Sequence, residues 1–473
     1  MNRIEIPAGE ITYHPLSCRD TTGRLFWWRN ALYRGIVAQK APLYQQLFHS
    51  GTAQRLIDKK LAVETELTAY ALDGYALILK HRAVPFVSYP DEWCALMCKD
   101  AALTLIDVEL ELARDGLSLH DGHPWNVLFD GCQPLFVDYG SFEPSWTDAI
   151  WSPHSEFCRF FLHPLRLMTQ GYGQLARCLL HDELGVLDAD VASLLHPGVL
   201  GFKTRLAVRR FFTGIKYRLP IPVRRVVGKW LLFLQSTFVK LSMRHYPSRV
   251  EFMQQLRHQV EAIAVPPAPT DWSECYAGAF PSFTPSAAWN AKHRNVHQVL
   301  TALRPLSVLD IGANRGWYAL LAAQLGAQVV ACDTDETCIN ALYRDAKLQN
   351  LPLLPLVLEF HQPQPRPTPF RQVLPPTQRL RCDLVLALGL VPQLVFKRQY
   401  RFEDILAGLA AYAQRWLLVE FMPPEDRDVR QWWSAAYAWY TLEQCIQVLR
   451  TQFREITVMP SAPEPRVLIL CAR

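Results

Sequence analysis

From residue 307 onward, apolar runs as long as a β-strand alternate with segments whose apolar residues recur at helical spacing. The strand-like runs are continuously apolar and do not alternate with polar residues, for example at 307–312, 327–333 and 382–390. Such runs are typical of a parallel sheet that helices cover on both faces. The last two runs, "FREITVMP" and "RVLILCAR", flank a Pro-containing turn and predict a hairpin appended to that sheet.

The chain is too long for one ordinary hydrophobic core, so its 473 residues predict two or three domains. Half of the residues are hydrophobic and a fifth are charged, which is a globular composition. The stretch 264–289, "AVPPAPTDWSECYAGAFPSFTPSAAW", is rich in Pro, Ser and Ala and predicts a linker. We therefore divide the chain into a first region at 1–263, this linker, and a second region at 290–473.

The first region has a less regular, α+β pattern. "RLFWWRNALYRGIV" predicts a two-stranded ribbon, and the apolar spacing from Glu92 to Asp115 predicts a helix. Residues 41–62 also have a helical pattern, 69–81 return to strand, and a further helical region runs from about 155 to 264. In the second region, the Pro-rich insert 361–378 predicts a loop over one edge of the sheet.

Several classes of protein are disfavoured by the composition. The N-terminus "MNRIEIPAGEITYHP" has acidic residues where a signal peptide has its apolar core, so we expect a cytoplasmic protein. The most apolar stretch, from Trp230 to Met243, is shorter than the roughly 20 residues that a membrane span needs. Twelve cysteines without a C-x-x-C pair predict reduced thiols and no metal site, and a net charge of +5 does not call for nucleic acid.

The run at 307–311 leads into a turn, "GANRG", whose glycines are Gly312 and Gly316. A dinucleotide fingerprint needs a second glycine where Asn314 stands, so that the backbone can approach a pyrophosphate. A P-loop needs a lysine where Trp317 stands. Both kinds of phosphate site are therefore disfavoured.

The pattern D-x-G-x-x-x-G after the first strand resembles motif I of the class I S-adenosylmethionine-dependent methyltransferases. The resemblance implies a Rossmann-like doubly wound sheet with an antiparallel last strand. It also implies that Asp310 faces the ammonium group of the cofactor, that Asp333 binds the ribose hydroxyls, and that Glu359 lies near the adenine. The expected cofactor site is Asp310, Gly312, Ala313, Asn314, Gly316, Asp333 and Glu359. The alternative is a generic doubly wound fold whose glycine turn only packs.

A second motif lies in the first region, in "LSLHDGHPWNVLFDGCQPLFVDYGSF". Asp121 precedes Asn126 by five residues, and Asp138 begins an Asp-Tyr-Gly on the following hairpin, which resembles the catalytic and magnesium-binding motifs of protein and small-molecule kinases. No Gly-rich loop or strand lysine accompanies them, although Arg34 occupies a comparable place. The resemblance implies a degenerate kinase-like fold; the alternative is a surface hairpin with incidental acids.

The chain as a whole resembles a group of bacterial proteins in which a kinase-like region precedes a class I methyltransferase, with the rhizobial nodulation methyltransferases as relatives. "VPFVSYPDEW", "PLFVDYGSFEP" and "LDIGANRGWYALLAAQLGAQVVACDTDE" support this likeness. The chain departs from the group at "LGLVPQL", where a His-His pair is usual, and at Glu359, where aspartate is usual. We name no catalytic base, because an activated sulfonium methyl mainly needs its acceptor positioned in line.

The stretch 203–249 holds twelve Lys and Arg residues and no Asp or Glu. Either these helices turn a basic face to solvent, or they attract an anionic partner, such as a lipid-linked acceptor at a membrane surface; we favour such an acceptor over RNA. Together the motifs predict a methyltransferase acting on a glycan, a glycolipid or another anionic small molecule, with the kinase-like half recognising that acceptor. An active small-molecule kinase fused to a methyltransferase and a noncatalytic cofactor-binding scaffold are the alternatives.

Overall fold

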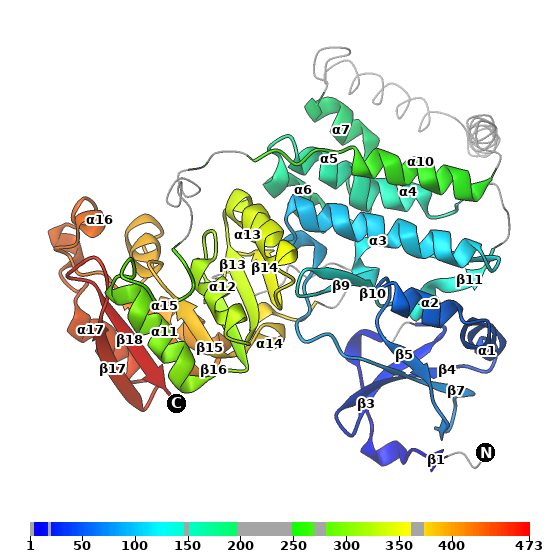
Figure 1. The fold of residues 1–473 in the computed structure, drawn as a ribbon, viewed down its shortest axis with the longest axis horizontal. Coiled ribbons are helices and arrows are strands. Elements are labelled where there is room, and N and C mark those ends of the chain that lie inside the picture. The colour runs from blue at the N-terminus through cyan, green and yellow to red at the C-terminus, as the bar shows by residue number, and fades with distance from the viewer. Residues whose placement is uncertain are drawn as a thin grey trace, which may run out of the picture. The chain divides into compact units, whose positions relative to one another are not determined.

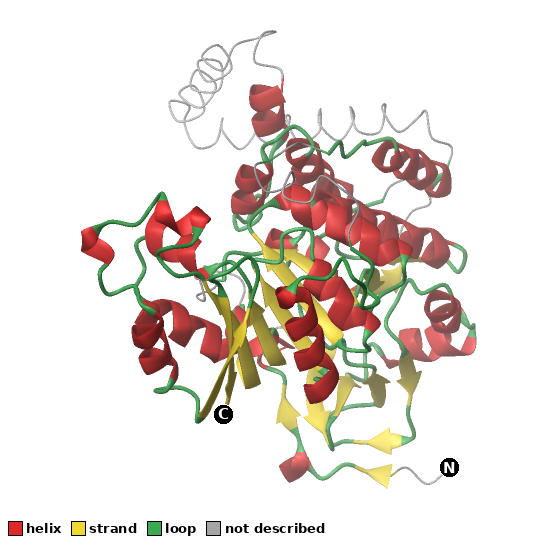
Figure 2. Ribbon diagram, turned by 60° about the vertical axis from the view of Figure 1, so that its left-hand side comes forward, coloured by secondary structure: helices red, strands yellow, loops and turns green. Residues whose placement is uncertain are grey.

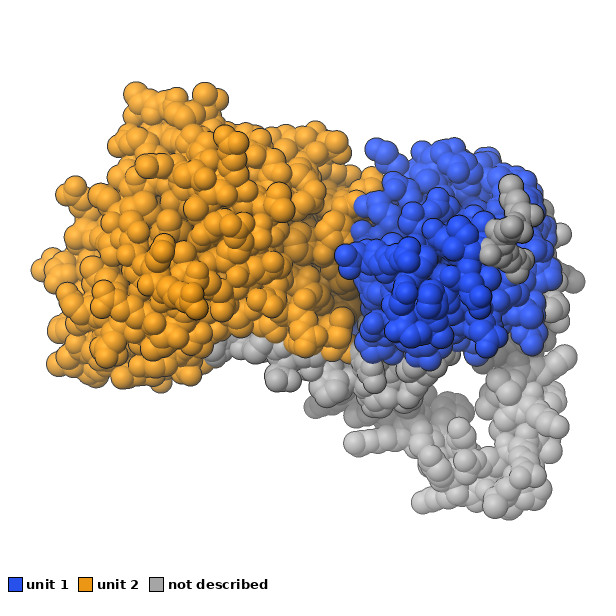
Figure 3. Space-filling view, turned by 90° about the horizontal axis from the view of Figure 1, so that it is seen from below, with its two compact units in different colours: residues 1–83, 99–127, 135–264 blue, residues 84–98, 128–134, 265–473 orange. Residues whose placement is uncertain are grey.

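The computed structural model describes residues 4–17, 20–145, 151–195, 248–267, 270, 281–360 and 373–473. The chain forms two compact units, which are coloured separately in Figure 3. Unit 1 comprises residues 1–83, 99–127 and 135–264, and unit 2 comprises residues 84–98, 128–134 and 265–473. The main part of unit 2 thus begins at the start of the predicted linker. Unit 2 also includes two segments from the first region of the sequence, 84–98 and 128–134.

Unit 1 contains an antiparallel sheet of five strands in the order β2-β3-β4-β7-β5 (Figure 1). Its strands are β2 (Thr12–Tyr13), β3 (Gly23–Trp28), β4 (Ala31–Ile36), β7 (Leu77–His81) and β5 (Thr65–Leu67). The predicted ribbon is the β3–β4 hairpin, whose two turn residues, Arg29 and Asn30, both have positive φ. That backbone suits the twist of a two-residue hairpin loop.

Further short strands and helices lie in the first region of the sequence, and their parts within residues 84–98 and 128–134 belong to unit 2. The short strands are β1 (Ile4–Glu5), β6 (Tyr70–Ala71), β8 (Leu117–Leu119), β9 (Val127–Asp130), β10 (Gln133–Phe136) and β11 (Phe142–Pro144). The helices are α1 (Ala41–His49), α2 (Thr52–Asp58), α3 (Ala95–Ala113), α4 (His154–Phe157), α5 (His163–Met168), α6 (Gly173–Leu179), α7 (Asp188–Leu195) and α10 (Arg249–Glu261). The predicted helix at 92–115 is α3, but the helical stretch 41–62 is two helices, because Gly51 adopts φ +78 between them.

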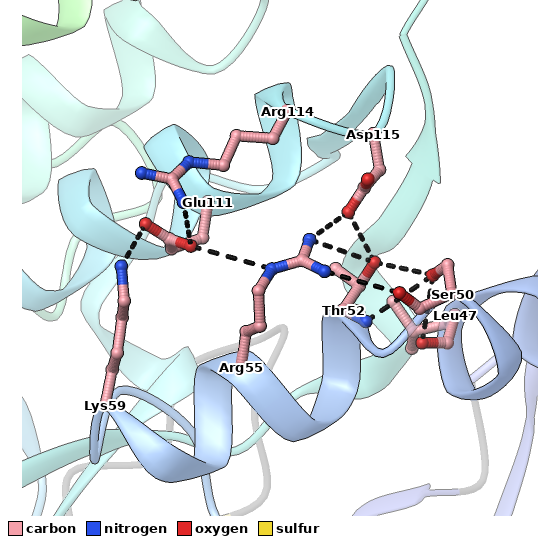
Figure 4. Close-up of polar contacts among 8 residues, drawn as sticks. All are labelled: Leu47, Ser50, Thr52, Arg55, Lys59, Glu111, Arg114 and Asp115. Atoms are coloured by element: carbon pink, nitrogen blue, oxygen red, sulfur yellow. Dashed lines mark hydrogen bonds and ion pairs between the residues drawn. The ribbon is translucent and has the colours of Figure 1, made fainter.

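A network of ion pairs fixes α2 against the end of α3 (Figure 4). Arg55 contacts Asp115 and lies 3.9 Å from Glu111, while Lys59 Nζ lies 2.6 Å from the same Glu111 carboxylate. The Thr52 hydroxyl donates to Asp115 over 2.5 Å. Several charges share these contacts, so the network holds its geometry better than an isolated surface pair would.

Unit 2 is built on a seven-stranded sheet in the order β14-β13-β12-β15-β16-β18-β17. Its strands are β12 (Ser307–Ile311), β13 (Gln328–Asp333), β14 (Leu353–Val357), β15 (Cys382–Ala387), β16 (Ala413–Phe421), β17 (Glu455–Pro460) and β18 (Val467–Ala472). All neighbours from β14 to β16 are parallel, and β18 is antiparallel to both β16 and β17. The α/β fold with a terminal antiparallel hairpin is confirmed.

Helices cover this sheet on both sides (Figure 2). They are α11 (Ala291–Leu303), α12 (Trp317–Gln324), α13 (Glu336–Leu348), α14 (Pro376–Arg379), α15 (Phe402–Tyr412), α16 (Arg427–Arg430) and α17 (Leu442–Leu449). The strand order reverses at β12, and parallel crossovers are right-handed, so α12 and α13 lie on one face and α15 lies on the other. The residues of β15 are buried throughout, as a central strand with two covered faces requires.

The segment 84–98 belongs to unit 2 because specific polar contacts hold it there. The Glu92 carboxylate, 3% exposed, forms an ion pair with Arg379 of α14, and Arg379 also donates to the carbonyl of Val87 over 2.6 Å. The first turn of α3 donates its free backbone N–H groups to side chains of α13, namely Glu336 and Asn340, each over 3.0 Å. Orphan donors at a helix N-terminus need such partners, so this segment is part of the structure of unit 2.

Parts of three predictions lie outside the described residues: most of the basic stretch 203–249, residues 268–269 and 271–280 of the linker, and residues 361–372 of the insert. Of the basic stretch, Arg249 is described, and it is buried. Its guanidinium donates to the carbonyl of Leu117 over 2.9 Å and lies 3.4 Å from Glu109, so it has a structural role. Within the described ranges, the chain has no helix that is both long enough and apolar enough to span a membrane.

Candidate functional site

The predicted cofactor residues lie at the carboxyl edge of the parallel strands of unit 2. Asp310 is the fourth residue of β12, and Asp333 is the last residue of the adjacent strand β13. The register pairs Asp310 with Ala331, so the two acids end neighbouring strands at the same edge. The chain reverses its winding between β12 and β15, and ligands of doubly wound folds bind outside the carboxyl ends at such a switch point.

Asp310 is a buried carboxylate, 2% exposed. Burial raises the pKa of Asp310 to about 7, the positive charge of Lys292 lowers it, and the negative charge of Asp333 raises it further. The two carboxylates therefore interact electrostatically, as is expected if both line one ligand site. A buried carboxylate with so high a pKa is compensated when a cationic ligand group binds beside it.

The turn after β12 is held by the second acid. The backbone N–H of Asn314 donates to Asp333 Oδ2 over 2.7 Å, and that of Asp335 donates to Oδ1 over 2.9 Å. Burial raises the pKa of Asp333 and these N–H donors lower it. The backbone N–H of Thr334 also lowers this pKa as a hydrogen-bond donor, and a carboxylate offers about four lone pairs, so acceptor capacity remains for a hydroxyl donor of a ligand.

Both motif glycines adopt a left-handed backbone, with φ +75 at Gly312 and φ +77 at Gly316. A Cβ on Gly316 would lie 2.5 Å from Leu342 Cδ1 of α13, so this glycine is required for packing. A Cβ on Gly312 would lie 3.3 Å from Leu390 Cδ1, which belongs to the segment after β15. The turn "GANRG", which includes Ala313, therefore borders the switch point.

Glu359 lies two residues beyond the end of β14, the strand next to β13 in the sheet. Its carboxylate lies 3.5 Å from the guanidinium of Arg398, which follows the π-helical turn η8 (Gln393–Lys397). The backbone N–H of Leu358 donates to the carbonyl of Asp333 over 3.0 Å, so Glu359 follows directly on a residue that is bonded to the end of β13. Its predicted place beside the adenine stays a prediction.

Two further charged residues at this edge were not foreseen. Lys292 Nζ lies 2.7 Å from Glu420 Oε2, and Ser461 Oγ donates to Glu420 Oε1 over 2.5 Å. Glu420 is wholly buried near the end of β16, and a Cβ on Gly389 would lie 3.8 Å from Glu420 Oε2. The acid in the apolar run "WLLVEF" was the available signal, since a charge in a buried strand needs a partner.

Unit 1 brings the predicted Asp138 to Arg34 of β4. Arg34 Nη2 lies 3.3 Å from Asp138 Oδ1, and Nη1 pairs with Asp20. Burial raises the pKa of Asp138 and the Arg34 guanidinium lowers it. The Asp-Tyr-Gly turn is anchored at Tyr139, whose carbonyl accepts from the Tyr44 hydroxyl over 2.6 Å. Arg34 thus forms an ion pair with Asp138, the aspartate of the Asp-Tyr-Gly turn.

The other two residues of this motif differ in their surroundings. Desolvation raises the pKa of Asp121 to about 6, and the negative charges of Glu156 and Asp138 add to this effect. Asn126 is 5% exposed, and its Nδ2 has no hydrogen-bond partner among the residues that the structure describes. A buried polar atom without a partner is unusual in a folded protein and marks a site to which a ligand could supply one.

Comparison with known proteins gives one relative that covers most of the chain. No protein-family model matches this chain. The relative is nodulation protein NoeA of Rhizobium meliloti (strain 1021). The chain is 25% identical to NoeA over 431 residues, and the match covers 88% of this chain and 86% of NoeA.

Solved structures match it over shorter stretches. Magnesium protoporphyrin IX methyltransferase ChlM from Synechocystis PCC 6803 with bound SAM is 17% identical, with TM-score 0.28, over 38% of this chain and 78% of ChlM. The bifunctional kinase-methyltransferase WbdD is 19% identical, with TM-score 0.29, over 39% of this chain and 40% of WbdD. The N-methyltransferase NodS from Bradyrhizobium japonicum WM9 is 15% identical, with TM-score 0.29, over 38% of this chain and 95% of NodS. Because the match to NoeA extends along most of both proteins, the chain is a homologue of that rhizobial nodulation protein.

Proposed function

We propose that this protein is an S-adenosylmethionine-dependent methyltransferase whose cofactor binds at the carboxyl edge of the sheet in unit 2. The observation that supports this most is the pair of acids, Asp310 and Asp333, at the ends of adjacent strands beside the switch point. The residues suit the cofactor chemically: the buried carboxylate of Asp310, with its pKa near 7, matches an ammonium group. The Asp333 carboxylate, held by backbone N–H donors, keeps acceptor capacity that suits a ribose hydroxyl.

In this proposal each residue has a defined task. Asp310 orients the amino-acid end of the cofactor, Asp333 holds the ribose, and the turn from Gly312 through Ala313 and Asn314 to Gly316 gives the backbone on which the cofactor rests. The bound cofactor supplies an activated methyl group. The chain then has to exclude water and position the acceptor, which is where most of the rate enhancement of such a transfer arises.

We further propose that the acceptor is a glycan, a glycolipid or another anionic small molecule, and that unit 1 recognises it. NoeA, the relative that covers most of the chain, is a nodulation protein, and the basic composition of 203–249 favours an anionic partner. To identify the acceptor, glycans and metabolites are extracted from a deletion strain and from its parent. Each extract is incubated with the protein and isotope-labelled S-adenosylmethionine, and the labelled products of the two extracts are compared. Cofactor binding without any labelled product would instead indicate a noncatalytic scaffold.

Calorimetry with S-adenosylmethionine tests the cofactor site directly. The variant Asp333→Ala loses charge-assisted hydrogen bonds to the ribose, so we expect its affinity to fall by about 1.5–3 kcal/mol. Asp58→Ala, an exposed acid of α2 in unit 1, is the matched control and should bind as the parent does. Unchanged affinity in Asp333→Ala would mean that the ribose lies elsewhere.

A phosphotransferase in unit 1 is the second candidate, because Arg34 faces Asp138 and Asn126 is buried with an amide nitrogen that has no partner among the described residues. We favour a degenerate kinase-like site, since a guanidinium that already pairs with Asp138 and Asp20 is a poor substitute for a phosphate-binding lysine. A thermal shift with ATP and magnesium that disappears in Asp138→Asn, accompanied by ATP turnover, would favour phosphotransfer. If ATP and magnesium cause no thermal shift, phosphotransfer is rejected, and acceptor recognition remains as the proposed role of unit 1.

A further inference from the structure

The ion pair between the partly exposed Lys292 and the buried Glu420 has no task in the function proposed above, although it lies at the same edge of the sheet. We propose that Lys292 binds the carboxylate of the methionine end of S-adenosylmethionine, and that Glu420 is the residue that positions Lys292 for this contact. This inference rests on the proposed cofactor site. It assigns the second charged group of the amino-acid end, for which the two acids Asp310 and Asp333 cannot be partners.

The topology places Lys292 at the cofactor edge. Helix α11 ends at Leu303 and is followed by β12, which begins at Ser307 at the amino edge of the sheet. The helix therefore begins near the opposite edge, and Lys292 is its second residue. Glu420 is the second-last residue of β16, and Asp310 is the second-last residue of β12, so all three charges lie at the carboxyl edge.

The lysine has hydrogen-bonding capacity to spare. An ammonium group has three N–H donors, and Glu420 Oε2 accepts one of them over 2.7 Å. The other carboxylate oxygen of Glu420 accepts from Ser461, so the glutamate is held from both sides. The Lys292 side chain is 15% exposed to solvent, and its Nζ lies 5.3 Å from the centre of the Tyr318 ring. Its head group is thus fixed in place without being sealed from ligands.

The charges match the amino-acid end of the cofactor, which carries an ammonium and a carboxylate on one carbon. Burial raises the pKa of Asp310, and Lys292 opposes that effect, so the anion and the cation of the protein lie within electrostatic range of each other. An anion for the ligand's ammonium and a cation for its carboxylate are the complement that a buried zwitterion needs.

The test uses three ligands that differ at this end of the molecule: S-adenosylmethionine, decarboxylated S-adenosylmethionine, which lacks only the carboxylate, and 5′-methylthioadenosine, which lacks the whole amino-acid end. Calorimetry on the full chain measures the affinity ratio between the first two. We expect the parent to favour S-adenosylmethionine about 10- to 100-fold, the range of a charge-assisted hydrogen bond. We expect Lys292→Met to lose this preference, because it removes the partner of the carboxylate and relieves repulsion of the more cationic decarboxylated ligand.

Removing Lys292 alone leaves the buried Glu420 carboxylate without its cation, so the double variant Lys292→Met/Glu420→Gln is measured beside it. Lys347→Met is the matched control, since Lys347 lies 5.7 Å from the Tyr343 ring in the last turn of α13 and should leave the ratio unchanged. Methylthioadenosine should bind all these variants equally. If the single and the double variant both keep the parent's preference, or if the parent has none, the assignment of Lys292 is wrong. If the parent binds none of the three ligands, the proposed cofactor site fails as well.

Discussion

Replacing Asp310 by asparagine should stabilise the ligand-free protein in a pH-dependent way. Burial raises the pKa of Asp310 from 3.8 to about 7, against the opposing charge of Lys292. A difference of one pH unit in pKa corresponds to about 1.4 kcal/mol, so keeping this carboxylate ionised in the folded state costs on the order of 4 kcal/mol. Asparagine has nearly the same shape and no charge, so the variant avoids that cost.

The direction of the effect with pH follows from the raised pKa. Between pH 3.8 and about 7 the folded protein retains a proton that the unfolded chain has released, so the parent loses stability as the pH rises through this window. The asparagine side chain of the variant has no proton to release. The difference in free energy of unfolding between Asp310→Asn and the parent should therefore widen by about 1.4 kcal/mol per pH unit up to pH 7 and remain constant above it.

Thermal unfolding of the full chain at pH 5, 6, 7 and 8 measures this difference, and S-adenosylmethionine identifies the transition of unit 2 in the parent. With about 2–4 °C per kcal/mol for a unit of this size, the Tm of the variant should gain about 5–10 °C on the parent between pH 5 and pH 7. Glu455→Gln, at an exposed position of β17, is the control whose Tm difference should not widen. A constant difference for Asp310→Asn would refute the burial argument, and undiminished cofactor binding by this variant would refute the ammonium contact.

Three further outcomes follow from packing. Gly316→Ala should lower the free energy of unfolding by about 1–3 kcal/mol in urea titrations, because a non-glycine residue strains φ +77 and its Cβ meets Leu342. Glu92→Gln should cost about 3–5 kcal/mol by leaving Arg379 buried and uncompensated, whereas Glu92→Leu/Arg379→Met should recover most of that loss in the same titration. A fragment that begins at residue 265 lacks Glu92 altogether, so we expect it to be insoluble or to give no cooperative thermal transition; a stable fragment would contradict the role of 84–98.

The sheet of unit 2 could be predicted because its signal is local. Continuous apolar runs between helical segments specify buried parallel strands, and the two runs predicted to form the terminal hairpin are β17 and β18 of the structure. The turn "GANRG" and Asp333 could be placed for the same reason, since a strand, a turn and a second strand fix their positions. Arg34 forms an ion pair with Asp138, and the kinase-like role of these residues stays a prediction.

What could not be predicted depends on contacts between distant residues. Nothing near Glu92 in the sequence points to Arg379, and nothing near Lys292 points to Glu420, because each pair forms only when the chain has folded. The break between α1 and α2 is a different case: Gly51 was visible, but a single glycine does not say whether a helix tolerates it or ends there.

The Glu92–Arg379 pair has a consequence for synthesis of the protein. Glu92 leaves the ribosome about 290 residues before its partner does, and at roughly 5–20 residues per second that delay is about 15–60 s. For most of this time the start of α3 also lacks the side chains of α13 that accept its N–H groups, since α13 follows about 240 residues after it. The nascent first half therefore cannot reach its final form by itself, and the two halves of this gene cannot be exchanged between relatives as if each encoded an independent protein.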